Sequence, residues 1–528
     1  HVRQIPSNTE STVLVDTLHS FAHRENHPMR EVPGYSTENR TAGVLHPVTA
    51  FNCPGPIGSL DGGREFVDWM SEVGLKIWQI LPLCPSDTFG SPYSSWSALS
   101  GDPTLVGLKW LEGMELLPEQ RTEIDERVVY SKARTEKLTA VLAASKSLLY
   151  NEKHWLHADL NDFLKSADWA REAAIFRTIW MEQGERPWWD WPIAFRDRDP
   201  QAMSLLCTTH KESIEIWQTA LFLFERQWQA LRNYTNSRGI RILGDMPIYV
   251  ARNSVDVWAN REFFQLDSEG QPSSVAGAPP DAYSDDGQLW GNPLFNWEAL
   301  EADGYRWWTE RVRRCLVHCD VLRIDHFIGF SRYWSIPSSS ESAKGGAWIK
   351  GPGRGVFDAI REQLGELPVV VEDLGDVDQG THDLRDALGL PGMRVIQFGL
   401  DGDLTNLHHP GQYPRNSIAY TSTHDSPTAA GWWETLNDHD KHRLGFGNHP
   451  KAASSRLVQE VLHSRAGWAI FPLADILGLG HEARINTPGT IHGNWTWRSP
   501  TPSAQESESL EFREALRSSN RLETQEER

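Results

Sequence analysis

Eight short apolar runs rich in β-branched residues recur along the chain, and polar or charged residues follow each one. They begin at residues 42, 76, 240, 320, 368, 393, 417 and 469. The runs are nearly continuous rather than alternating, which is typical of strands buried on both faces of a parallel sheet. Helical patterns lie between most of them, and three of these patterns, at 64–74, 355–365 and 381–389, close on a glycine. The order predicts a (β/α)8 TIM barrel, an α/β fold.

The spacing of the runs predicts an insertion after the second strand. The second and third runs begin 164 residues apart, at 76 and 240. We assign residues 84–239 to a mostly helical insertion that packs on the barrel as a subdomain. Its clearest helical pattern is an apolar stripe at steps of three and four residues, formed by Ile214, Trp217, Leu221, Phe224, Trp228 and Leu231.

The ends of the chain differ in composition from its middle. We predict an N-terminal extension over residues 1–40 and a polar C-terminal tail over 499–528 that holds at most a short helix. Residues 41–498 then form the catalytic barrel domain, with its active site at the carboxyl ends of the strands.

The charge and aromatic content restrict the partners. With 51 Lys and Arg against 71 Asp and Glu, the formal net charge is -20, which argues against nucleic acid and anionic membranes. No apolar run approaches the roughly 20 residues that span a bilayer. The 24 tryptophans fit either a larger core or platforms for sugar rings.

The five cysteines, Cys53, Cys84, Cys207, Cys315 and Cys319, show no CxxC spacing. Neither a disulfide framework nor a zinc site is indicated, and a reducing compartment is the simplest location. We therefore expect a cytoplasmic protein. Because the chain starts with His1 rather than Met, the plastid stroma after removal of a transit peptide stays open as an alternative.

Three acids follow three different predicted strands: Asp325 in "LRIDHF", Glu372 in "VVVEDLG" and Asp425 in "YTSTHD". A barrel gathers such residues in one pocket, and paired carboxylates are what glycoside chemistry requires. Arg323 lies two residues before Asp325 and so on the same strand face. We expect its guanidinium to keep Asp325 ionised, with a low pKa.

Six motifs in this order give a specific resemblance: "GDMPIYVARNSVDVWANREFF", "AGAPPDAYSDDGQLWGNPLFNW", "LRIDHFIGF", "VVVEDLG", "LPGMRVIQF" and "YTSTHD". The chain resembles the 4-α-glucanotransferases, also called amylomaltases or disproportionating enzymes, which form glycoside hydrolase family 77 in the α-amylase clan. The resemblance extends from about residue 40 to 498 and is weakest in the insertion. The chain departs from the family pattern at Ile328, Ser426 and Pro427, so chain-length preference does not carry over.

The resemblance implies a role for each matching acid. Asp325 would be the nucleophile of a covalent glycosyl-enzyme, Glu372 the general acid/base, and Asp425 would bind ring hydroxyls and stabilise the transition state. It implies further substrate-binding residues: Arg323, His424, Tyr93, Asp245, Asp281, Trp290 and His326. Trp290 and Tyr93 would be sugar platforms, and Asp281 would lie in a loop at 276–288 over the pocket. His326 is the weaker histidine because neighbouring strand residues point to opposite faces.

The function implied by the resemblance is transfer of α-1,4-glucan segments between maltooligosaccharides, starch or glycogen-derived chains, with glucose as an acceptor. A retaining double displacement predicts carboxyl groups of Asp325 and Glu372 roughly 5 to 5.5 Å apart. Neither a metal nor a cofactor is expected. Two alternatives stay open: a hydrolase of the same clan, and a glycan-binding protein without catalysis. Oligomeric state is not predicted.

Overall fold

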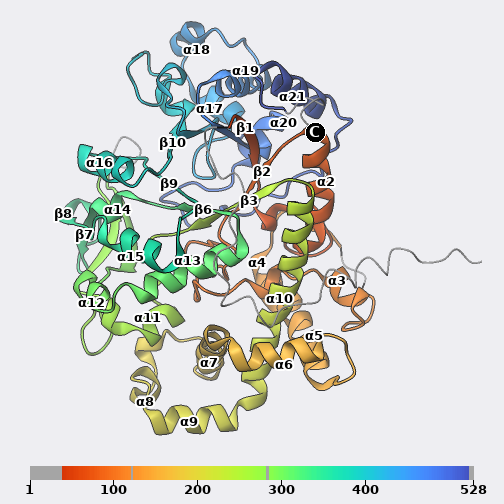
Figure 1. Cartoon of the computed structure of the whole chain (residues 1–528), viewed down its shortest axis with the longest axis vertical. Coiled ribbons are helices and arrows are strands. Elements are labelled where there is room, and N and C mark those ends of the chain that lie inside the picture. The colour runs from red at the N-terminus through yellow and green to blue at the C-terminus, as the bar shows by residue number, and fades with distance from the viewer. Residues whose placement is uncertain (1–38, 121–122, 281–284, 523–528) are drawn as a thin grey trace, which may run out of the picture.

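The computed structural model describes residues 39–120, 123–280 and 285–522. Its centre is a closed barrel of eight parallel strands in the order β1, β12, β11, β10, β9, β6, β3, β2 (Figure 1). The strands are β1 Thr41–Leu45, β2 Ile77–Gln79, β3 Arg241–Met246, β6 Val321–Ile324, β9 Val369–Val371, β10 Gly392–Val395, β11 Ser417–Tyr420 and β12 Trp468–Pro472. Each strand lies at one of the eight apolar runs, so the predicted (β/α)8 barrel is confirmed.

Burial explains why the runs lack alternation. Nearly every residue of the eight strands is buried, since one side faces the barrel interior and the other faces the helices. The helices outside the insertion are α2 Gly63–Val73, α11 Val255–Ala259, α12 Trp297–Ala302, α13 Arg306–His318, α14 Ile328–Ser331, α15 Gly355–Leu364, α16 Gln379–Ala387, α17 Ala429–Thr435, α18 Asp438–Leu444, α19 Pro450–His463, α20 Leu473–Leu477 and α21 Ser507–Ser518. Gly74 and Gly365 follow α2 and α15 with φ of 101° and 83°, a conformation that favours glycine and ends a helix.

The insertion after β2 is helical, as predicted, and lies on one side of the barrel (Figure 1). Its helices are α3 Leu108–Gly113, α4 Tyr130–Lys132, α5 Leu138–Tyr150, α6 His157–Ser166, α7 Asp168–Glu182, α8 Ile193–Arg196, α9 Pro200–Thr209 and α10 Lys211–Ser237. All six residues of the predicted stripe are buried on α10. Trp228 of this stripe packs beside Trp78 of β2, and its indole nitrogen donates to the carbonyl of His318 at 3.0 Å. The stripe therefore joins the insertion to the barrel.

A second sheet was not expected. Strands β5 Gln288–Pro293, β4 Ser274–Ala278, β7 Arg332–Pro337 and β8 Ala347–Lys350 form it in this order. The segment 276–288 is thus not wholly a loop, because its two ends are strands that pair antiparallel. A glycine in each strand and the proline at the end of β5 masked the pattern, since neither residue is typical of strands.

The segment after residue 498 contains α21, which packs on the barrel. Phe512 and Leu516 are buried, and the ring of Phe512 meets that of Phe471 edge-on at 5.3 Å. Arg521 donates to several backbone carbonyls between residues 462 and 467. The segment has the composition of a tail because few of its residues are apolar, and of these Phe512, Ala515 and Leu516 are buried whereas Leu510 is exposed.

The tryptophans mostly belong to the core. All lie in the described part of the chain, and only Trp155 and Trp290 have exposed side chains. Within the described ranges, no helix combines the length and the apolar character needed to cross a bilayer.

Candidate active site

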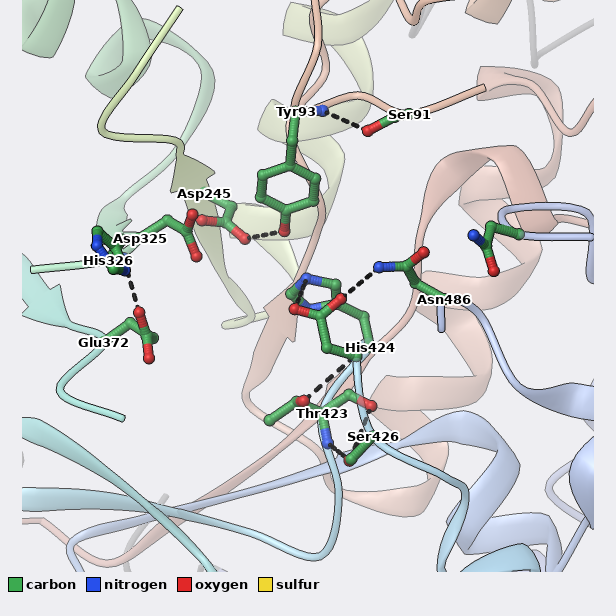
Figure 2. Close-up of polar contacts among 12 residues, drawn as sticks. Ser91, Tyr93, Asp245, Asp325, His326, Glu372, Thr423, His424, Ser426 and Asn486 are labelled. Carbon is green, nitrogen blue, oxygen red and sulfur yellow. Dashed lines mark hydrogen bonds and ion pairs between the residues drawn. The ribbon is translucent and has the colours of Figure 1, made fainter. Parts of the chain in front are cut away.

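The three predicted carboxylates lie at one end of the barrel, just beyond the strands. Ile324 and Val371 are opposite each other in the pairing of β6 with β9, and Asp325 and Glu372 are the next residues. Asp425 lies in the loop between β11 and α17. In Figure 2, Asp325 and Glu372 lie on one side of the view and His424 on the other, with Asp245 between them.

Arg323 and Asp245 form a buried ion pair under Asp325. Nη1 of Arg323 donates to both carboxylate oxygens of Asp245, at 2.6 and 2.7 Å, and Nη2 donates to Asp325 at 2.9 Å. The hydroxyl of Tyr93 donates to Asp245 at 2.7 Å. The side chain of Asp245 has no exposed surface and that of Arg323 is 4% exposed. The two side chains are therefore buried supports that orient Asp325 and Tyr93, and they are not themselves open to solvent.

The electrostatics of Asp325 differ from expectation. Burial raises the pKa of Asp325 above its ordinary value, and the negative charges of Asp245 and Asp425 raise it further. Arg323 acts in the predicted direction, but its effect is smaller than that of burial. The prediction that Arg323 holds this pKa low is therefore wrong, because the sequence did not show how much water the site excludes.

Glu372 is held by two backbone amides. The N–H of His326 donates to Oε2 at 2.7 Å and that of Leu374 to Oε1 at 3.0 Å. Burial, followed by the nearby charge of Asp325, raises the pKa of Glu372 above its ordinary value and above that of Asp325. Because Glu372 has the higher pKa, one proton on this pair of carboxyls resides on Glu372 around neutral pH, and Asp325 is ionised. Two carboxyls with separated pKa values are the arrangement that acid/base chemistry on a glycoside requires.

His326 lies in a turn and not in the strand. Its φ is 52°, so the alternation of a strand does not apply to it. Its ring packs edge-on against Trp290, with 4.8 Å between centroids. Burial lowers the pKa of His326 to about 4, so the ring is neutral at neutral pH. Nε2 is buried and has no hydrogen-bond partner among the described residues.

His424 and Asp425 lie next to Tyr93. The rings of His424 and Tyr93 stack at 5.2 Å with 7° between their planes. Nε2 of His424 lies 3.4 Å from Asp425, whose side chain is 43% exposed while that of His424 is buried. The structure thus brings together an enclosed histidine and an accessible carboxylate next to it.

Trp290 belongs to strand β5, which pairs antiparallel with β4. Trp290 on β5 is partly exposed beside His326, and its indole nitrogen donates to Gln288 at 3.0 Å. This geometry places an accessible aromatic ring near Asp325. Asp281 lies outside the described residues.

Two residues of the site had no signal of their own in the sequence. The side-chain amide of Asn486 donates to Asp425 at 2.7 Å, and its backbone N–H donates to the carbonyl of His424 at 3.0 Å. The ring of Trp495 lies 5.8 Å from that of Tyr93. Both follow the last strand, β12, in a segment dense in Asn, Gly, Thr and Trp, which is the only hint that they belong to an active-site loop.

The described residues contain no group of three or more His, Cys, Asp or Glu side chains suited to a metal ion.

Comparison with known proteins points to one family. Residues 46–503 match the family described as 4-alpha-glucanotransferase. A chloroplastic/amyloplastic 4-alpha-glucanotransferase of Arabidopsis thaliana is 39% identical over 505 residues, which cover 93% of this chain and 87% of the relative. The 4-alpha-glucanotransferase of Thermus thermophilus is 38% identical over 473 residues, 86% of this chain and 93% of the relative.

Solved structures agree with the sequence comparison. An amylomaltase from Streptococcus agalactiae in complex with acarbose superposes with a TM-score of 0.87 at 32% identity, covering 92% of this chain and all of that one. An amylomaltase from Corynebacterium glutamicum, at 17% identity and a TM-score of 0.73, shares the fold. The match over nearly the whole barrel, together with paired carboxyls at its strand ends, gives one conclusion: the chain belongs to the 4-α-glucanotransferase family, glycoside hydrolase family 77.

Proposed function

We propose that this chain transfers α-1,4-glucan segments by a retaining double displacement, with Asp325 as nucleophile and Glu372 as general acid/base. The observation that carries the proposal is the pair itself. The two carboxyls follow adjacent strands in register, and Glu372 has the higher pKa. Neutral pH therefore leaves an ionised nucleophile beside a protonated acid, as a retaining mechanism requires.

In the first half of the reaction, a carboxylate oxygen of Asp325 attacks the anomeric carbon of the donor. The bond from that carbon to the glycosidic oxygen breaks, and the leaving 4-hydroxyl receives the proton of Glu372. In the second half, Glu372 takes the proton of an acceptor 4-hydroxyl, which attacks the anomeric carbon and releases Asp325. The amides of His326 and Leu374 hold Glu372 in place throughout.

The substrate contacts follow from exposure and free hydrogen-bonding groups. Asp425 accepts hydrogen bonds from donor-sugar hydroxyls, and His424 and Asn486 orient it. Nε2 of the neutral His326 bonds a further hydroxyl. The faces of Tyr93 and Trp290 stack on sugar rings.

Two of the residues expected to bind substrate play other parts in this proposal. Arg323 and Asp245 act from beneath Asp325 and do not touch the sugar, because their charged groups are already engaged with each other and with Asp325 and Tyr93. Asp281 lies outside the described residues, and its assignment to the acceptor sugars rests on the family resemblance.

The proposed donors are maltooligosaccharides and starch or glycogen-derived chains, and glucose is an acceptor. The support is the family description and a related amylomaltase solved with acarbose.

The proposed location is a reducing compartment, since all five cysteines are free thiols. One relative is chloroplastic/amyloplastic by name, so the candidates are plastid stroma and cytoplasm, which an immunoblot of fractionated source cells distinguishes.

Incubation with maltotriose tests the function. Transfer yields glucose together with a ladder of chains longer than maltotriose, whereas hydrolysis yields only maltose and glucose. An unchanged substrate with retained glucan binding would identify a binding protein instead. The matched control is Asp325→Asn, which keeps the shape of the side chain and removes the nucleophile, and we expect it to produce no ladder while still binding maltotriose.

A further inference from the structure

The loop that carries His424 and Asp425 is fastened at both ends by one side chain. The loop starts after β11, at Thr421, and ends where α17 begins, at Ala429. The side chain that touches both ends is Asp475 of α20, the short helix that follows β12. This residue lies outside the carboxylate pair and outside the proposed substrate contacts.

The contacts of Asp475 are short and enclosed. Oδ2 accepts from the hydroxyls of Thr421 and Ser422, both at 2.5 Å, and Oδ1 accepts from the backbone N–H of Ala429 at 2.7 Å. Asp475 is 1% exposed, and Ser422 is buried as well. A buried carboxylate without a cationic partner is costly unless its oxygens are fully hydrogen-bonded, so all three donors are needed.

A separate buried hydrogen bond reaches the backbone of Asp475 and not its carboxylate. The hydroxyl of Ser454, on α19, donates to the backbone carbonyl of Asp475 at 2.9 Å. Ser454 is fully buried, and this bond joins it to the backbone of α20 and not to the 421–429 loop. Ser454 therefore belongs to the support of α20, whereas the carboxylate of Asp475 belongs to the support of the loop.

Inside the loop, several bonds are local and others come from the segment after β12, while Nε2 of Gln397 donates to the carbonyl of Pro427 at 3.0 Å. Asp425 N–H donates to Thr423 Oγ1 at 3.2 Å, and Thr423 N–H donates to Ser426 Oγ at 2.8 Å (Figure 2). Asn486 holds the outer side of His424 and Asp425. These contacts shape the loop, but the loop ends are bound to Asp475.

We propose that Asp475 is a positioning residue for glucan transfer, because its carboxylate ties both ends of the 421–429 loop and so sets where Asp425 and His424 meet the donor sugar. The proposal rests on the proposed function of Asp425 and His424. A displacement of reacting or binding groups by about 1 Å costs on the order of 10²-fold in rate. Loss of the tie is therefore visible in transfer kinetics, not only in stability.

The test compares Asp475→Asn with Ser454→Ala, assayed on maltotriose well below both melting temperatures and normalised to folded protein. The asparagine keeps the volume but cannot accept from all three donors. We expect kcat/KM to fall on the order of 10- to 100-fold in Asp475→Asn. Ser454→Ala removes a buried hydrogen bond nearby and should lower Tm while leaving kcat/KM within about twofold.

A double-mutant cycle separates positioning from general destabilisation. If Asp475 acts through Asp425, the loss of kcat/KM in the Asp475→Asn/Asp425→Ala double variant is clearly smaller than the product of the two single losses, and what remains is the part exerted through His424. Independent effects would multiply in full. Should Asp475→Asn fail to fold, Ser422→Ala removes one donor without altering the buried charge, and we expect the same coupling at smaller size. Wild-type kcat/KM in folded Asp475→Asn or Ser422→Ala, or multiplicative effects, would overturn the inference. Full activity of Asp425→Ala would instead overturn the proposed function.

Discussion

Nη1 of Arg323 donates to both carboxylate oxygens of Asp245, at 2.6 and 2.7 Å, beneath the proposed nucleophile. The two residues are opposite each other on the neighbouring strands β3 and β6. Because the second amino group of this guanidinium reaches Asp325, the nucleophile is oriented by a planar cation that is itself fixed by another strand. The compact ammonium group of a lysine cannot hold both carboxylates in this geometry.

Arg323→Lys tests this bridge. We expect kcat/KM for transfer to fall on the order of 10²-fold, since the lysine amine cannot reach both acids with the fork geometry of arginine. The acid limb of kcat/KM against pH should also move to higher pH, because a weaker cationic interaction raises the pKa of Asp325 further. Arg314→Lys is the matched control: Arg314 is also buried and ion-paired, with Glu225 at 2.9 Å. Equal kinetic losses in both variants would contradict the bridge.

The pH dependence of kcat/KM should be bell-shaped and displaced upward. Asp325 must be ionised, so activity is lost as pH falls through its pKa, and Glu372 must be protonated, so activity is lost as pH rises through its pKa. Burial raises both values, so both limbs lie above the ordinary carboxyl values of 3.8 and 4.5.

Glu372→Gln assigns the alkaline limb. With α-glucosyl fluoride as donor, whose leaving group needs no proton, we expect the variant to form the glycosyl-enzyme with kcat/KM that no longer falls at high pH. With maltotriose, the same variant should be nearly inactive. An alkaline limb that persists unchanged with the fluoride would assign that limb to another group.

The two exposed tryptophans provide a matched pair for the proposed sugar platform. Trp290 lies beside His326, whereas Trp155 lies in the insertion, between α5 and α6. We expect Trp290→Ala to raise KM for maltotriose about tenfold, equivalent to ~1.4 kcal/mol of binding, and Trp155→Ala to leave it unchanged. Quenching of tryptophan fluorescence by maltotriose should disappear only in the first variant. Loss of quenching in Trp155→Ala would move the platform to the insertion.

Tyr93→Phe isolates the hydroxyl from the ring. The ring stack with His424 stays, while the 2.7 Å bond to Asp245 is lost. A hydrogen bond to a charged group contributes about 1.5–3 kcal/mol, so kcat/KM should fall about 10- to 100-fold if the transition state feels the whole loss. Tyr413→Phe is the control, because the buried Tyr413 hydroxyl donates to the carbonyl of His408 at 2.9 Å. An unchanged kcat/KM in Tyr93→Phe would show that Arg323 alone fixes Asp245.

The barrel could be predicted because its strands are buried on both faces, which leaves continuous apolar runs that few other arrangements produce. The β4–β7 region could not, since its strands contain glycine and proline and its face is only partly buried. The sequence allowed for a short helix after residue 498 but did not show that α21 packs on the barrel, because a surface helix that buries little more than Phe512, Ala515 and Leu516 has the composition of a polar tail.

For the candidate site, residue types and strand ends were sufficient to predict that Asp325, Glu372 and Asp425 lie at the same end of the barrel, but not their environment. Period-two alternation does not apply to His326, because that residue lies past the strand in a left-handed turn. Asn486 and Asp475 act across long separations in sequence, so only the folded chain brings them to the 421–429 loop. The pKa of Asp325 depends on excluded water, which no local pattern encodes.

The direct pairing of β2 with β3 has a consequence for folding. Ile77 pairs with Arg241 although residues 80–240 lie between the two strands. The pairing of β2 with β3 therefore closes one of the longest loops in the chain. The entropy of closure falls when the intervening segment is already compact, and α10 leads back to the start of β3. We expect the insertion to become protected before the barrel closes. Pulse-labelled hydrogen exchange would then detect α10 earlier than β2 during refolding.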